Sequence, residues 1–129
     1  MATWSGAHAP YKVTYSATGV YQGDWLTHTD FNKYFRDNLL YLQDLCNQLF
    51  PSAHIVVNIP EATLGAIANT DMFNGIEQGI YDIATASQIS DKVSKPIEWS
   101  AGDHAPTFAD LNRYSNDILT LYNHLSFLS

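Results

Sequence analysis

The chain has 129 residues, 46% of them hydrophobic, which is enough for one domain with a genuine core. Its formal charge is −7, from 13 acidic residues against 6 Lys and Arg, and this argues against nucleic acid or an anionic membrane as the main partner. No apolar run approaches the roughly 20 residues of a membrane-spanning helix, and the first residues lack the basic and apolar regions of a signal peptide. We therefore expect neither a membrane anchor nor classical export.

The N-terminal part, residues 1–19, is predicted to be an extended arm that carries a short strand. Residues 1–10 are small and polar and end in proline, so we expect them to be mobile or bound to a partner unless something covers Trp4. Residues 12–16 alternate polar and apolar side chains, as a half-buried strand does. Residues 20–24 can form a short return strand and turn.

The first helical segment follows Thr27 and ends before Pro51. Hydrophobic residues recur in it at spacings of three and four, which predicts an amphipathic helix with one buried face. They are Phe31, Phe35, Leu39, Leu42, Cys46 and Leu49. Cys46 is the single cysteine, and its place on this face indicates a small core residue.

Two further helices each follow an extended segment. Residues 54–60 are rich in β-branched side chains and precede a helix that contains Gly75 and Gly79, where we interpret the glycines as sites of close backbone packing. Residues 93–99 precede the last helix. The predicted buried faces comprise Phe73, Ile76, Ile80 and Ile83 in the second helix, and Leu111, Tyr114, Ile118, Leu121 and Leu125 in the third.

The starts of the three helices are copies of one pattern. In each copy an N-cap residue is followed five positions later by asparagine, and an acid stands in the first turn, near the positive end of the helix dipole. The N-cap residues are Thr27, Asn69 and Thr107, the acids are Asp30, Asp71 and Asp110, and the asparagines are Asn32, Asn74 and Asn112. The asparagines lie 42 and 38 residues apart, a period typical of repeated supersecondary units.

These patterns predict a helix-dominated α+β fold. A single domain over residues 20–129 would contain three related units, 20–51, 62–92 and 99–127, each with a helix entered through a short extended segment or β-ribbon. A linear array of repeats is the alternative. We expect each repeated asparagine to bond through its side-chain amide to its approach ribbon or to a neighbouring helix, with a solvent-facing or ligand-binding role as the alternatives.

The chain offers no motif for catalysis, a metal ion or a cofactor. Its five histidines and Cys46 never fall at the spacings that bring metal ligands together, and no phosphate-binding, dinucleotide-binding or nucleophile motif is present. Helix capping explains the acids at the helix starts better than an acid/base pair does. We therefore predict a protein that is not an enzyme.

Aromatic residues outside the helix faces are the candidate partner contacts. They are Trp4, Tyr15, Tyr21, Trp25 and Trp99. Such residues can pack over helix ends within the domain, or anchor a protein or a sugar. The sequence leaves these three uses open.

The repeated pattern resembles a short module of tailed-phage virion proteins, particularly tail-fibre, baseplate and appendage proteins. Residues 99–103 (Trp-Ser-Ala-Gly-Asp) and 110–112 (Asp-Leu-Asn) carry the resemblance in the third copy, and residues 73–80 (Phe-Asn-Gly-Ile-Glu-Gln-Gly-Ile) carry it in the second. The first and third copies depart from it, because Phe35 and Ser115 stand in place of the module's glutamate.

The resemblance implies a structural role in a virion assembled in the host cytoplasm. We expect an assembly or adaptor subunit that docks a fibre, an appendage or a neighbouring subunit and forms a homo-oligomer, with the arm of residues 1–19 reaching a neighbour, for example by strand addition. The alternative is a receptor-recognition module that binds cell-surface carbohydrate through exposed Trp and Tyr side chains.

Overall fold

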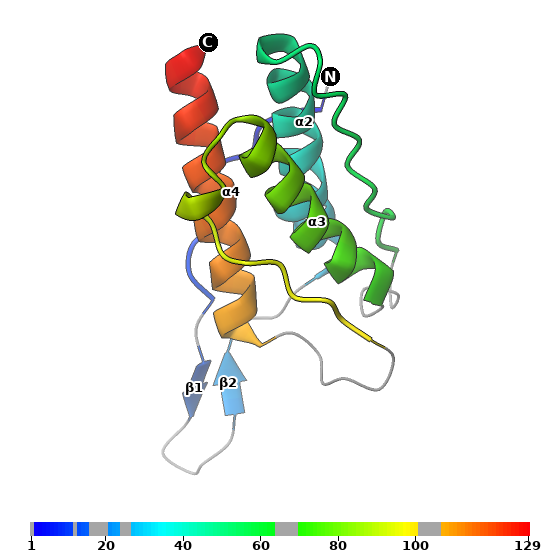
Figure 1. Cartoon of the computed structure of the whole chain (residues 1–129). Coiled ribbons are helices and arrows are strands. Elements are labelled where there is room, and N and C mark those ends of the chain that lie inside the picture. The colour runs from blue at the N-terminus through cyan, green and yellow to red at the C-terminus, as the bar shows by residue number, and fades with distance from the viewer. Residues whose placement is uncertain (1, 12, 16–20, 24–26, 64–69, 101–106) are drawn as a thin grey trace.

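Three long helices dominate the computed structural model, which describes residues 2–11, 13–15, 21–23, 27–63, 70–100 and 107–129 (Figure 1). The first helix is continuous and comprises α1 (His28–Asp30), the π-helical segment η1 (Phe31–Asp37) and α2 (Asn38–Leu49). The others are α3 (Thr70–Ala86) and α4 (Phe108–Leu128), with the short 3-10 helix η2 (Ser90–Lys92) after α3. Each long helix packs against the other two, so the units form a closed bundle and not a linear array.

The predicted helix faces form the core of this bundle. On the predicted face of the second helix all four residues are buried, and on that of the third all five are buried. The face of the first helix is fully buried from Phe31 to Cys46, with Leu49 at the edge. Cys46 is therefore the small core residue that its spacing predicts. Burial raises the pKa of its thiol, which keeps it protonated and unreactive.

The π-helical segment explains one irregularity in the spacing of the core residues. In α3 and α4 the first core residue is followed by the second after three positions, from Phe73 to Ile76 and from Leu111 to Tyr114. In the first helix the same step takes four positions, from Phe31 to Phe35, and both residues lie in η1. A π-helical turn takes up an extra residue, so the remaining core positions stay in register with those of the other helices.

Three extended segments, which we call straps, run along the helices. Strap 1 (residues 2–11) lies between α2 and α4, where the Trp4 ring stacks on Tyr122 with centroids 4.0 Å apart and lies 6.1 Å from Tyr41. Strap 2 (residues 54–62) lies between the first helix and α3, and strap 3 (residues 93–99) between α3 and α4. Apolar side chains of all three straps join the core, so the straps belong to the fold and do not merely cover it.

One β-ribbon within the described part of the chain stands apart from the bundle (Figure 1). Strands β1 (Val13–Tyr15) and β2 (Tyr21–Gly23) pair antiparallel with Thr14 opposite Gln22, and Figure 1 shows them at the end of the bundle away from the marked chain ends. The helix-dominated part of the prediction is confirmed. The α+β class and the β-ribbon form of the helix entrances are not supported, because straps 2 and 3, which lead to the second and third helices, are extended and contain no strand.

The predicted N-terminal arm is divided between strap 1 and the ribbon. Trp4 is covered by Tyr122, and the Tyr11 side chain is only 4% exposed. The sequence predicts that residues 1–10 are mobile or bound to a partner unless something covers Trp4. The chain itself covers Trp4, so this exception applies. Burial of these aromatic rings holds residues 2–11 against the bundle without help from a neighbour.

We predict opposite effects for two alanine substitutions in α3. A Cβ at Gly75 would lie 2.3 Å from the Asn58 carbonyl oxygen in strap 2, so Gly75→Ala should lower the free energy of unfolding by about 1–3 kcal/mol through overpacking. A Cβ at Gly79 would meet Val57 at an ordinary 3.5 Å, so Gly79→Ala should be neutral or stabilising by up to about 1 kcal/mol. Urea denaturation of both variants checks this, and equal effects would contradict the close approach of strap 2 to α3.

Candidate functional site

Each repeated asparagine holds the main chain of one strap residue through two hydrogen bonds, an arrangement we call an asparagine clamp. The side-chain Nδ2 donates to the carbonyl oxygen of the strap residue, and Oδ1 accepts from the N–H of the same residue. The pairs, with donor–acceptor distances, are Asn32 with Ala62 (2.8 and 2.8 Å), Asn74 with Trp99 (2.9 and 2.7 Å) and Asn112 with Tyr11 (3.1 and 2.7 Å). The clamps thus provide the hydrogen bonds that a neighbouring strand would supply in a sheet.

The three clamps close a ring of units. Asn32 in the first helix holds strap 2, and Asn74 in α3 holds strap 3. Asn112 in α4 holds strap 1, 101 residues earlier in the chain. The expectation that these amides bond is confirmed, but the expected partners are wrong, because each asparagine bonds the strap of the next unit and not its own approach segment. The reason is geometric, since the next strap lies in the groove beside the helix that carries the asparagine.

Further amide side chains of α2 strengthen the hold on straps 1 and 2. Asn38 is fully buried, accepts from Ser5 N at 2.9 Å and donates to Gly6 O at 2.9 Å. Two others bond strap 2: Asn47 pairs with both main-chain groups of Ile55, and Gln43 accepts from Val57 N. Sequence reasoning missed these three because they lie outside the repeated pattern at the helix starts. Their only signal is an amide inside an amphipathic helix.

A buried carboxylate joins strap 3 to α3 and α4. Glu77 is 4% exposed, and Arg113 donates to both of its oxygens, at 2.8 and 2.6 Å. Its Oε2 also accepts from the Tyr114 hydroxyl at 2.8 Å and from Trp99 Nε1 at 3.0 Å. Both oxygens are engaged by internal donors, so Glu77 serves as a structural anchor. Burial, reinforced by the Glu77 charge, raises the pKa of Tyr114, which therefore stays protonated as a donor.

The predicted helix starts agree with the structure wherever the chain is described. Thr27 accepts from Asp30 N, and Thr107 forms a capping box with Asp110. Asp71 lies in the first turn of α3. Asn69, predicted as the third cap, falls outside the described residues. The cap residues and their acids therefore serve to start helices.

The five candidate partner contacts are distributed unevenly. Trp4 is stacked on Tyr122, and Trp99 is 8% exposed with its indole bonded to Glu77, so both are used inside the domain. Tyr15 and Tyr21 are paired residues of β1 and β2. Trp25 lies outside the described residues. Trp4 and Trp99, the two whose side chains are described, therefore belong to separate clusters and not to one site.

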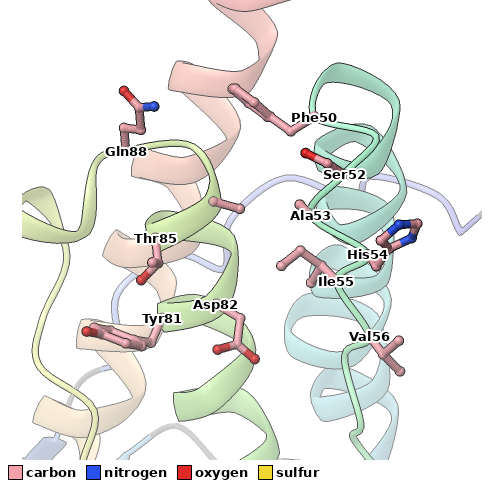
Figure 2. Close-up of a pocket in the computed structure, with 11 residues that line it drawn as sticks. Phe50, Ser52, Ala53, His54, Ile55, Val56, Tyr81, Asp82, Thr85 and Gln88 are labelled. Atoms are coloured by element: carbon pink, nitrogen blue, oxygen red, sulfur yellow. The ribbon is translucent and has the colours of Figure 1, made fainter.

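A hollow lies between α3 and the segment that leaves α2 (Figure 2). Figure 2 shows Asp82 of α3 facing that segment, whereas His54 and Val56 point away from α3. His54 and Gln88 line the hollow with left-handed backbone, φ 51° and 66°. Gln88 follows the end of α3, where its N–H and that of the next residue bond back to the last helical turn, so its conformation is explained by helix termination. The hollow therefore shows no convergence of reactive groups.

Over the described ranges, no three His, Cys, Asp or Glu side chains gather as a metal site would require. Nor does any helix in that part of the chain combine the length and apolar character needed to cross a bilayer. Comparison with protein-family models, curated proteins and solved structures returns no match. Function is therefore inferred from the geometry of the clamps and of the Glu77 cluster, which is Glu77 with Arg113, Tyr114 and Trp99.

We predict that Asn112→Ala destabilises the fold by about 1–3 kcal/mol, because it removes both bonds to Tyr11 in strap 1. Asn116→Ala, at an exposed position one turn later on α4, should change stability by less than about 0.5 kcal/mol. Thermal and urea unfolding compare the two variants. Equal free energies of unfolding for Asn112→Ala and Asn116→Ala would show that the clamp contributes nothing to the stability of the fold.

A second carboxylate, Asp117, holds the start of strap 3. It is 7% exposed and accepts from Ser94 N at 3.3 Å. Burial raises the pKa of Asp117 above its ordinary value of 3.8, although the bonds from Ser94 and the charge of Arg113 oppose this shift. The folded state therefore favours the protonated form of this side chain more than the unfolded state does.

The raised pKa predicts the sign of a pH effect. The stability linked to Asp117 is fully present below its unfolded pKa of 3.8 and is lost as the pH rises through the raised folded pKa. Asp117→Asn, which keeps an acceptor for Ser94, should therefore gain stability relative to the unchanged chain as the pH rises from 3 to 7. Urea unfolding across this range measures the difference, with exposed Asp91→Asn as the control. A constant difference between Asp117→Asn and the unchanged chain would contradict the prediction.

Proposed function

We propose that the chain is a structural subunit of a tailed-phage virion, an assembly or adaptor protein that docks a fibre, an appendage or a neighbouring subunit. The observation that carries the proposal is the use of the repeated motif. Its asparagines, which belong to the part of the sequence that resembles the phage module, clamp the straps of a closed bundle. The motif therefore stabilises the fold of a domain by fixing its straps to its helices.

A role without catalysis is supported by how the described polar residues are used. The most buried carboxylate, that of Glu77, is engaged by four donor contacts from Arg113, Tyr114 and Trp99. The capping acids bond the first turns of helices. A catalytic site needs a titratable group that faces a substrate pocket, and these carboxylates are committed to internal partners.

Apolar side chains on the surface support docking to other proteins. Phe127 is 86% exposed at the end of α4, and Val56 is 78% exposed on strap 2. Exposed apolar groups lose contact with water when a partner covers them, which favours association. We include in the proposal that copies of the chain assemble into a homo-oligomer.

The competing proposal is a module that binds cell-surface glycans. Two of the aromatic residues on which it depends are not available to a sugar. A sugar stacks on an open aromatic face, but Trp4 is stacked on Tyr122 and Trp99 is buried. Glycan-array binding that disappears in Trp25→Ala while the fold is retained would favour this alternative. Trp99→Ala is unsuitable for that test because it also removes a contact to Glu77.

The proposal predicts that the chain is a component of the finished particle. Virions purified from an infection that produces the chain should contain it at a fixed ratio to the other structural proteins, measured by quantitative mass spectrometry. Particles washed at high salt serve as the control for proteins that merely adhere. Absence of the chain from washed particles, while it is abundant in the infected cell, would overturn the proposal.

A further inference from the structure

The groove between α2 and α4 has the properties of a binding site for an extended peptide. Asn38 and Asn112 bond the main chain of strap 1 at Ser5, Gly6 and Tyr11. Bonds to a peptide main chain provide affinity, and pockets for side chains provide selectivity. The groove therefore recognises a peptide by its backbone and by a few anchor residues.

Aromatic side chains supply the anchors at both ends of strap 1. The Trp4 ring lies parallel to the Tyr122 ring, with an interplanar angle of 1°. The His8 ring meets Tyr34 edge-on at 4.8 Å and stacks on Tyr11 at 4.0 Å. The peptide that fits this groove thus carries Trp and Tyr seven residues apart, and the chain itself contains that segment.

Strap 1 differs from the other straps in how it joins the bundle. All three long helices follow strap 1 in the chain, whereas straps 2 and 3 each connect two of them. From the clamped strap residue to the asparagine of the next helix there are 21 residues after Tyr11, against 12 after Ala62 and 13 after Trp99. Strap 1 can therefore leave its groove without breaking a connection between helices.

The length of this connection also sets its reach. The β1–β2 ribbon folds this connection back on itself; once the ribbon opens, the 15 residues between Tyr11 and Thr27 span at most about 50 Å. That distance is larger than the length of α4, whose 21 residues rise by about 30 Å. A strap on such a connection can reach the groove of an adjacent subunit.

We propose that, in the assembled protein, the groove between α2 and α4 of one copy receives strap 1 of a second copy. The contacts would be the same as those within one chain, so the exchange preserves both bonds of the Asn112 clamp and the stack on Tyr122. The balance between the two forms then depends on local concentration, which is high when subunits are held side by side. This inference identifies a second copy of the chain as the partner in the assembly role proposed above. It rests on that role only for the assembly in which the exchange would occur.

Disulfide trapping between full-length copies tests the exchange. A tagged Trp4→Cys chain and an untagged Tyr122→Cys chain are unfolded together, refolded at high concentration and mildly oxidised. We expect a disulfide-linked dimer of tagged and untagged chains on a non-reducing gel. In the matched control, Asn116→Cys replaces Tyr122→Cys on an exposed part of the same helix and should give at least fivefold less dimer, although its thiol is more accessible. Cys46 is fully buried and does not compete.

A second measurement leaves the sequence unchanged, in case loss of the Trp4 ring prevents folding. Isotope-labelled and unlabelled copies are refolded together, and a filtered NMR experiment records contacts that join a labelled to an unlabelled chain. Contacts between the Trp4 and Tyr122 rings should appear across copies. Their confinement to one chain, together with equal dimer yield from Tyr122→Cys and Asn116→Cys, would overturn the exchange. Particle composition is measured separately, so this failure would leave the proposed virion role standing.

Discussion

The fold depends on one interaction, in which the side chain of a helical asparagine bonds both main-chain groups of a single strap residue. An extended segment packed on helices has no neighbouring strand, and its buried N–H and C=O groups are costly if they stay unpaired. The clamps at Ala62, Trp99 and Tyr11 meet this requirement at the same position of each strap. Because both bonds go to one residue, each clamp also fixes the position of the strap along its helix.

The order of the clamps makes the three units dependent on one another. Each unit holds the strap of the next, and the last holds the first, so none has both its groove and its strap satisfied alone. In a linear repeat array, by contrast, a unit contacts only its neighbours and the ends need caps. Closure gives this small domain a core bounded by three helices and three straps, which buries more apolar surface than three helices would.

The sequence predicts only part of the candidate site. The repeated asparagines stand out because the motif recurs, and an amide inside a helix indicates a bonding partner. The Glu77 cluster gave no such signal, since Glu77 and Arg113 lie 36 residues apart and meet only when α3 packs on α4. Trp4 and Trp99 were candidates for partner contacts because aromatic residues suit both a core and an interface. Only packing showed that the protein uses both of them internally.

The amino-acid sequence by itself determined the helices, their buried faces and the two described caps. These features arise from interactions within four or five residues, such as the bond from Asp110 N to the Thr107 hydroxyl, and local spacing reveals them. The tertiary structure decided which strap each asparagine holds, where the extra residue of the first helix is absorbed and that strap 1 fills a groove. The three clamps join residues 25 to 101 positions apart, and the strap that each one holds depends on which grooves the packed helices leave open.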